Sequence, residues 1–132
     1  MIIYDFLFYN AYKLSKKSDN FRDIPIIGGV IWVVPFLIYN ILSIVFFLEG
    51  SNIFYKRLDW FIRVAIAAAT TILVFTYYYK NKKYLKIINK YDNYPLLRST
   101  IFQLLIIFSY HLLGFIILLI SGLYRNKDWI FK

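Results

Sequence analysis

The stretch TIFQLLIIFSYHLLGFIILLIS, residues 100–121, decides the fold class of this chain. It contains no Lys, Arg, Asp or Glu, and most of its side chains are Leu, Ile or Phe. A helix of about 20 apolar residues crosses the roughly 30 Å hydrocarbon core of a bilayer, where the backbone has no partner except its own helix. The stretch therefore predicts a membrane-spanning helix, which we expect Gly122 to end.

Two further apolar stretches lie upstream. Residues 24–48 carry no charged side chain and exceed the length needed to cross, so we expect this helix to tilt. It should also bend at Pro35, because proline removes one backbone hydrogen bond. Residues 60–79 begin and end with aromatic side chains, as expected at the two headgroup layers, and the long stem of Arg63 lets its guanidinium reach the nearer one. Together these stretches predict three spans.

Two amphipathic segments flank the spans. Residues 1–17 place Asp5, Asn10 and several lysines on one side of a helical projection, and their apolar run is too short to cross, so we expect a helix lying in the interface. Residues 80–91, KNKKYLKIINKY, predict a basic amphipathic cytoplasmic helix that extends the second span. The expected fold is an all-α membrane protein, with a single domain over residues 1–132. The alternative is a four-helix membrane bundle, whose fourth, half-length crossing would come from the first residues.

The composition agrees with this class. Of the 132 residues, 61% are hydrophobic and 22% aromatic, which is more apolar surface than so short a chain can bury. A formal net charge of +9 would suggest nucleic acid in a soluble protein, but here no basic stretch lies on a soluble module. The expected partner is therefore a bilayer with anionic headgroups, and not nucleic acid. The candidates for headgroup contact are Lys80, Lys82, Lys83, Lys86 and Lys90.

Lysine and arginine are unevenly distributed among the segments between the spans. Three spans with the N-terminus inside place ten of these residues on the cytoplasmic side and six outside. The inverse orientation would put the most basic loop outside, against the positive-inside rule. We therefore expect a cytoplasmic N-terminus. The N-terminal segment lacks the basic region and cleavage pattern of a secretory signal, so we expect insertion through the internal helices.

Small and polar residues inside the spans are candidates for helix packing or for lining an aqueous path. A polar and small stripe on the third span should face protein or water, and alanines four apart on the second span allow close helix approach. Packing is the favoured interpretation, and its partner, within the chain or in a second copy, is left open. The candidates are Asn40, Ser43, Ala65, Ala69, Thr76, Gln103, Tyr110, His111, Gly114 and Ser121.

The sequence contains no recognisable motif for catalysis or metal binding. His111 is the only histidine, and no acidic residue lies inside a span to form a proton relay with it. A neutral histidine hydrogen-bonded to a neighbouring helix is the better interpretation. A single His does not make a metal site, and the chain has no Cys. We expect no enzyme activity, no cofactor and no metal.

The layout of the chain, with YYKNKKYLKIINKY at residues 78–91 before the last span, resembles small multi-pass membrane proteins of AT-rich bacteria, notably Bacteroidota. The likeness covers the order of the segments and the Lys-, Tyr- and Ile-rich composition of this stretch. It implies a location in a bacterial inner membrane. It carries over no functional residue.

Three hypotheses for function follow. The favoured one is a non-enzymatic membrane effector that oligomerises in the bilayer and alters its permeability. Oligomerisation is required because three spans are too few to enclose a pore. The second is an immunity or accessory protein that binds another membrane protein through residues 80–91 or 49–60. The third is a small dimeric transporter, which would use Asn40, Gln103 and His111 at the centre of the membrane.

Overall fold

The computed structural model describes residues 2–53 and 58–127, and this part of the chain consists of helices joined by turns, without strands. Three of the sixteen cationic residues used to predict the orientation lie outside the described residues, namely Lys56, Arg57 and Lys132. The elements in chain order are α1 (Ile2–Lys17), α2 (Pro25–Gly50), α3 (Trp60–Tyr79), η1 (Lys80–Lys82), α4 (Lys83–Tyr91), η2 (Pro95–Arg98) and α5 (Thr100–Asn126).

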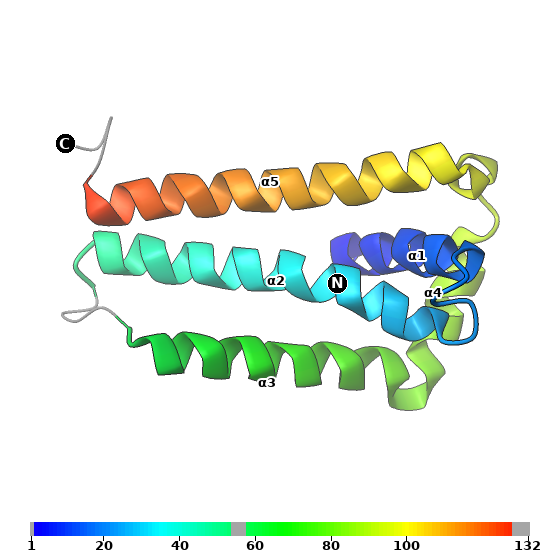
Figure 1. Cartoon of the computed structure of the whole chain (residues 1–132), viewed down its shortest axis with the longest axis horizontal. Coiled ribbons are helices and arrows are strands. Elements are labelled where there is room, and N and C mark those ends of the chain that lie inside the picture. The colour runs from blue at the N-terminus through cyan, green and yellow to red at the C-terminus, as the bar shows by residue number, and fades with distance from the viewer. Residues whose placement is uncertain (1, 54–57, 128–132) are drawn as a thin grey trace.

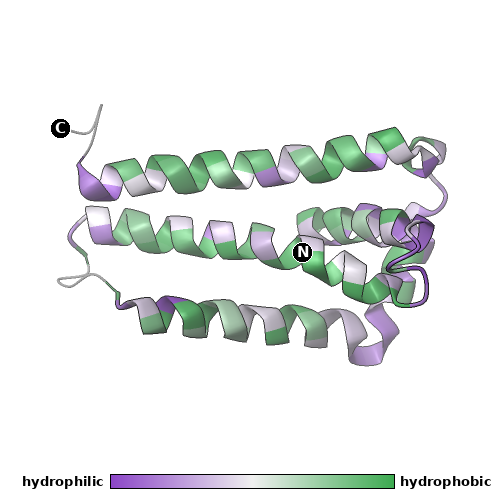
Figure 2. Cartoon of the chain, viewed as in Figure 1, coloured by the Kyte–Doolittle hydropathy of each residue, from purple (hydrophilic) through white to green (hydrophobic). Residues whose placement is uncertain are grey.

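Three long helices lie alongside one another, with α2 between α5 and α3 (Figure 1). The helix α2, the helix α5 and the segment Trp60–Tyr91 are long and apolar enough to cross a membrane. Hydrophobic residues run along the length of these helices, and hydrophilic residues gather at the two ends (Figure 2). The described chain is thus an all-helical protein with three candidate membrane spans, consistent with an integral membrane protein.

The short helix α1 lies against α2 and α5, and also touches α4. It begins near the middle of the bundle and runs to the end where α4 lies, which we call the polar end (Figure 1). Residues 7–10 and Ala11 are fully buried, including Asn10, which the sequence assigned to the polar side of this helix. A half-length helix therefore packs on every side against the rest of the chain in its central turns.

Two glycines of α2 make this close approach possible. A Cβ atom on Gly29 would lie 2.7 Å from Cε2 of Phe8, and one on Gly28 would overlap the side chain of Ser15. Because real Cβ atoms essentially never approach other heavy atoms so closely, larger residues at these two positions would push α1 away. The first turns of α2, which begins with Pro25 at its first helical position, thus form the surface on which α1 packs.

The basic segment does not continue the axis of α3, so the prediction of a helix that extends the second span is wrong. Asn81 and Lys82 have left-handed backbone angles, with φ of 56° and 51°, and they separate α3 from α4. Two successive left-handed residues cannot be part of a right-handed α-helix. The chain therefore turns at this point, and α4 lies at the polar end (Figure 1).

The last helix ends later than the sequence indicated. Gly122 lies inside α5, which continues to Asn126 and ends at Lys127, a residue with a left-handed φ of 57°. The amide of Lys127 donates to the carbonyl oxygens of Leu123 and Tyr124, and so satisfies the last turn. The added turn brings Arg125 to the end of the bundle opposite α4, which we call the far end.

Candidate functional site at the polar end

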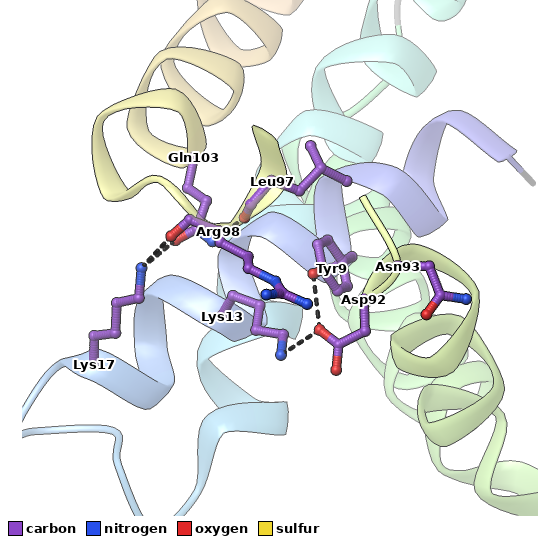
Figure 3. Close-up of a pocket in the computed structure, with 8 residues that line it drawn as sticks. All are labelled: Tyr9, Lys13, Lys17, Asp92, Asn93, Leu97, Arg98 and Gln103. Atoms are coloured by element: carbon purple, nitrogen blue, oxygen red, sulfur yellow. Dashed lines mark hydrogen bonds and ion pairs between the residues drawn. The ribbon is translucent and has the colours of Figure 1, made fainter. Parts of the chain in front are cut away.

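A hollow of about 500 Å3 lies at the polar end, where α1, the turn after α4, η2 and the start of α5 meet (Figure 3). Three cationic side chains and one carboxylate face it, together with a tyrosine, two amides and a leucine. Its lining residues are Tyr9, Lys13, Lys17, Asp92, Asn93, Leu97, Arg98 and Gln103.

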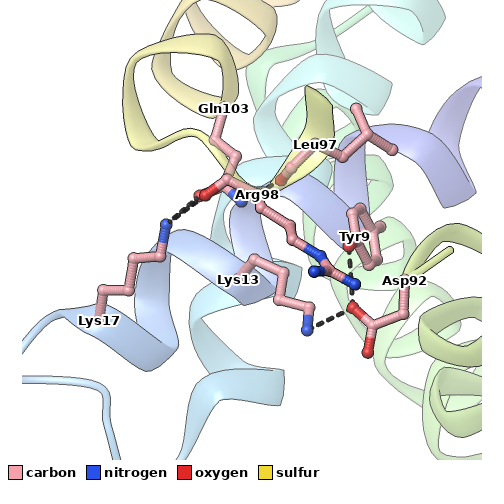
Figure 4. A network of polar contacts seen from close by, with 7 residues as sticks. All are labelled: Tyr9, Lys13, Lys17, Asp92, Leu97, Arg98 and Gln103. Atoms are coloured by element: carbon pink, nitrogen blue, oxygen red, sulfur yellow. Dashed lines mark hydrogen bonds and ion pairs between the residues drawn. The ribbon is translucent and has the colours of Figure 1, made fainter. Parts of the chain in front are cut away.

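The ammonium group of Lys17 joins the end of α1 to the start of α5. It donates to the carbonyl oxygen of Arg98 at 3.1 Å and to the hydroxyl of Thr100 at 2.9 Å. It also donates to Oε1 of Gln103 at 3.2 Å (Figure 4). The buried amide of Gln103 in turn donates to the carbonyl oxygen of Leu97 at 2.5 Å. An ammonium group has three donors, so Lys17 is fully used.

A second set of contacts joins α1 to the turn after α4. The carboxylate of Asp92 pairs with Nζ of Lys13 at 2.5 Å and accepts a hydrogen bond from the hydroxyl of Tyr9 at 3.0 Å. The bond from Lys13 holds the pKa of Asp92 below its usual range. Burial, with the neighbouring carboxylate, raises the pKa of Tyr9 to about 12, so the tyrosine stays a donor at all ordinary pH values.

Arg98 differs from the other cations of the hollow. Its guanidinium projects toward Tyr9 and Asp92 (Figure 4), yet it makes no side-chain hydrogen bond or ion pair with any residue the structure describes. With Asp92 already matched by Lys13, the hollow keeps an excess of positive charge. Its chemistry is that of an anion site, and among the described residues no group of His, Cys, Asp or Glu could hold a metal ion.

The lysines predicted to contact headgroups also lie at this end. Lys80, Lys82, Lys86 and Lys90 are exposed, while Lys83 is partly covered, with its Nζ 3.5 Å from the centre of the Tyr77 ring. Exposed cations on an amphipathic helix fit the predicted contact with anionic headgroups, which stays a prediction.

The far end is held by a buried carboxylate, that of Glu49, which directly follows the first long apolar stretch. The side chain of Glu49 is 1% exposed and accepts a hydrogen bond from the amide of Leu58 at 2.8 Å. It also pairs with Arg63 of α3 at 3.5 Å and with Arg125 of α5 at 3.6 Å. Both guanidinium groups lie over the ring of Phe46. One carboxylate thus joins three helices. The guanidinium of Arg63, which the sequence analysis expected to reach a headgroup layer, pairs with Glu49.

The small and polar stripe of α5 faces the interior of the same chain. Gln103, Gly114 and Ser121 are buried, and Tyr110 is half-buried with its ring 5.3 Å from that of Phe36. A Cβ on Gly114 would lie 3.0 Å from the same phenylalanine ring. The Ser121 hydroxyl donates to the carbonyl oxygen of Ile117. These contacts favour packing of α5 on α2 over the lining of an aqueous path.

The polar residues near the centre of the bundle are not brought to one site. Asn40 donates to the carbonyl oxygen of Phe36 and to the hydroxyl of Tyr4, and Ser43 donates to its own helix. His111 uses Nδ1 on the carbonyl oxygen of Ile107, four residues back. Gln103 is two turns away along α5, about 12 Å, and is engaged at the polar end. None of the hydrogen bonds among the described residues joins Asn40 to Gln103 or His111.

The small residues of α3, in contrast, lie on an exposed side of that helix, where the hydroxyl of Thr76 donates to the carbonyl oxygen of Ile72 in the same helix. Ala65, Ala69 and Thr76 are exposed, and they lie on the side opposite Thr70 and Val74, which pack on the bundle. Only 11% of the most apolar part of this segment is buried, against 28% for α2 and 17% for α5. The small face of α3, meaning these three exposed residues, is open at Ala65 and Ala69, and only Thr76 borders a hollow that α3 shares with Val33 and Leu37 of α2.

Sequence reasoning missed the two ionic clusters because their members are far apart in the chain. The spacing of Lys13 and Lys17, four apart on one helix face, was the available signal at the polar end. The isolated Glu49 directly after a long apolar stretch was the signal at the far end. Comparison of the chain with protein-family models, with curated proteins and with solved structures finds no match.

Proposed function

We propose that this chain is a non-enzymatic protein of a bacterial inner membrane that self-associates in the bilayer and, once assembled, alters its permeability. The observation that carries the proposal is the small face of α3, which is exposed on a helix apolar enough to cross a membrane. In lipid, helices associate by close packing rather than by the hydrophobic effect, and small residues four apart permit that packing. Ala65 and Ala69 have this spacing.

The interior of the single chain supports assembly as the requirement for any path across the membrane. Ser43, Thr70 and Ser121 donate to carbonyl oxygens of their own helices, so their hydroxyl protons are not directed at a shared aqueous path between the helices. The three spans of one chain pack against each other through their side chains. A path for ions or solutes across the membrane would therefore have to form between several copies of the chain.

The distribution of charge supports an orientation with the polar end in the cytoplasm. Ten of the sixteen Lys and Arg residues precede the first span or lie between the second and third. In the proposed orientation, α4 and the exposed end of α1 face the anionic cytoplasmic leaflet, where each nearby cation contributes about 1 kcal/mol of attraction.

The test compares the wild-type chain with the double variant Ala65→Leu/Ala69→Leu in detergent and in cells. Leucine at these positions blocks close approach without adding polarity. Ser109→Leu is the matched control, because Ser109 is also exposed but lies on α5. We expect cross-linking in native membranes to capture oligomers of the wild type and the control, and chiefly monomers of the double variant.

Membrane polarisation, followed with a potential-sensitive dye after induced expression, tests the second half of the proposal. We expect depolarisation by the wild type and the control, and none by the double variant at equal membrane level. Oligomers that persist in the double variant would refute the role of the small face of α3. A wild type that is monomeric and harmless would refute self-association and favour binding to a different membrane protein.

A further inference from the structure

We propose that the hollow at the polar end is a specific binding site for one anionic phospholipid, with its phosphate held by Arg98 and Lys13 and its acyl chain in a neighbouring apolar hollow. The site is distinct from the exposed lysines of α4, and it does not depend on self-association of the chain.

The unmatched donors belong to two residues. Arg98 has five N–H donors and makes no side-chain hydrogen bond within the described chain, and Lys13 uses one of its three donors on Asp92. A planar guanidinium matches the oxygen atoms of a phosphate in a two-pronged contact. Arg98 and Lys13 together can therefore engage more than one oxygen of the same phosphate.

The frame of the hollow, apart from the exposed side chain of Arg98, is held by hydrogen bonds before a ligand arrives. The three bonds of Lys17 hold the first turn of α5, so this ammonium group adds positive charge but has no donor to spare. The bond from Tyr9 and the pair with Lys13 occupy Oδ1 of Asp92 and offset its repulsion of an anion. A preformed site loses less conformational entropy on binding than one that must be ordered.

A second hollow identifies the ligand as a lipid rather than a free anion. It has a volume of about 360 Å3 and shares Lys17 with the first hollow. Leu14, Phe21 and Trp32 give it an apolar wall, and Trp32 is 41% exposed, as expected for an aromatic side chain that meets lipid. The opposite side of this hollow is polar, with Ser15, Ser18 and Thr100 beside Lys17. A charged hollow and a hollow with one apolar wall, on either side of one lysine, match the two parts of a phospholipid.

The position of the site along the bundle agrees with this ligand. Arg98 lies two residues before the start of α5, whose second residue, Ile101, is already 71% exposed and apolar. The hollow therefore lies where the apolar surface of the bundle begins. The phosphate layer of a bilayer meets the hydrocarbon at the same place on a spanning helix.

The experiment is native mass spectrometry of the full chain released from detergent micelles, with lipid titrated in. Dioleoyl phosphatidylglycerol is compared with dioleoyl phosphatidylcholine, and inorganic phosphate is added as a competitor at the concentration of the lipid. The variant Arg98→Gln tests the site, because the side chain of Arg98 has no internal bond to lose. Lys16→Gln is the matched control, since Lys16 is exposed at the same end and lines neither hollow.

We expect one phosphatidylglycerol retained per wild-type chain and per control chain, and roughly tenfold weaker retention by Arg98→Gln, the loss expected for charge-assisted hydrogen bonds. Far-UV circular dichroism should show that the variant keeps its helices. Equal retention of phosphatidylcholine, or an equal loss in Lys16→Gln, would overturn a specific anionic site. Displacement of the lipid by equimolar inorganic phosphate would overturn its assignment to a lipid.

Discussion

The substitution Glu49→Ala tests whether the far end of the bundle is held by one buried carboxylate. At 3.5 Å and an effective dielectric constant of about 20, each Arg–Glu pair has a gross attraction of about 5 kcal/mol, most of which desolvation offsets. Removing the carboxylate leaves the amide of Leu58 without its acceptor and leaves Arg63 and Arg125 to repel each other. Breaking a buried pair costs about 3–5 kcal/mol, and both guanidinium groups are partly exposed, so we expect a loss of about 2–3 kcal/mol.

The assay is reversible unfolding in dodecyl maltoside micelles titrated with sodium dodecyl sulfate, followed by far-UV circular dichroism. Glu49→Gln separates the two contributions, because a glutamine can still accept from the amide of Leu58 but carries no charge. We expect it to fall between the wild type and Glu49→Ala. Double-mutant cycles with Arg63→Gln and Arg125→Gln should show coupling to Glu49. A loss below about 0.5 kcal/mol for Glu49→Ala, the usual range of a surface substitution, would refute the reasoning.

Two further predictions concern the docking of α1. Gly29→Ala should destabilise the protein by about 1–3 kcal/mol, because the added Cβ meets the ring of Phe8, and hydrogen exchange should show faster exchange in α1. The pair between Lys13 and Asp92 should stabilise the fold at neutral pH. Since Lys13 lowers the pKa of Asp92, this contribution is present above the usual carboxyl pKa of 3.8 and is lost as the pH falls through the lowered value. An acid titration of Asp92→Asn, monitored by circular dichroism, should lack this loss.

The number and type of the long helices could be predicted from the sequence, because lipid requires long apolar stretches and internally bonded backbone. The turn between α3 and α4 could not, since KNKK contains neither Gly nor Pro. Asparagine tolerates the left-handed region, but a lysine beside it in the same region is unusual and depends on the contacts of α4. The prediction that Gly122 ends the last helix was wrong, because a glycine ends a helix only where its backbone turns left-handed, and α5 continues through Gly122 to Asn126.

The candidate packing residues were predicted better than the ionic sites. A small or polar side chain inside an apolar stretch must find a partner, so Gln103, Gly114 and Ser121 could be assigned to one face by helical periodicity alone. Which of the faces meets the chain's own helices depends on how the helices pack, and only the structure separates the buried stripe of α5 from the exposed alanines of α3. Charged residues at the ends of spans are common because they mark the membrane boundary. For that reason the position of Glu49 in the sequence did not indicate that its carboxylate joins three helices.

The docking of α1 and the proposed lipid site depend on the same contacts. The helix buries Asn10, whose Oδ1 has no hydrogen-bond partner in the described chain, so the centre of α1 carries a polar cost. The bonds of Lys13 and Lys17 at its end help to offset that cost. A phosphate bound between Lys13 and Arg98 requires α1 in its docked position, so binding must stabilise docking by the same free energy with which docking strengthens binding. Phosphatidylglycerol should therefore slow hydrogen exchange in α1 of the wild type, and at the same lipid concentration Arg98→Gln should weaken this protection without itself loosening the helix.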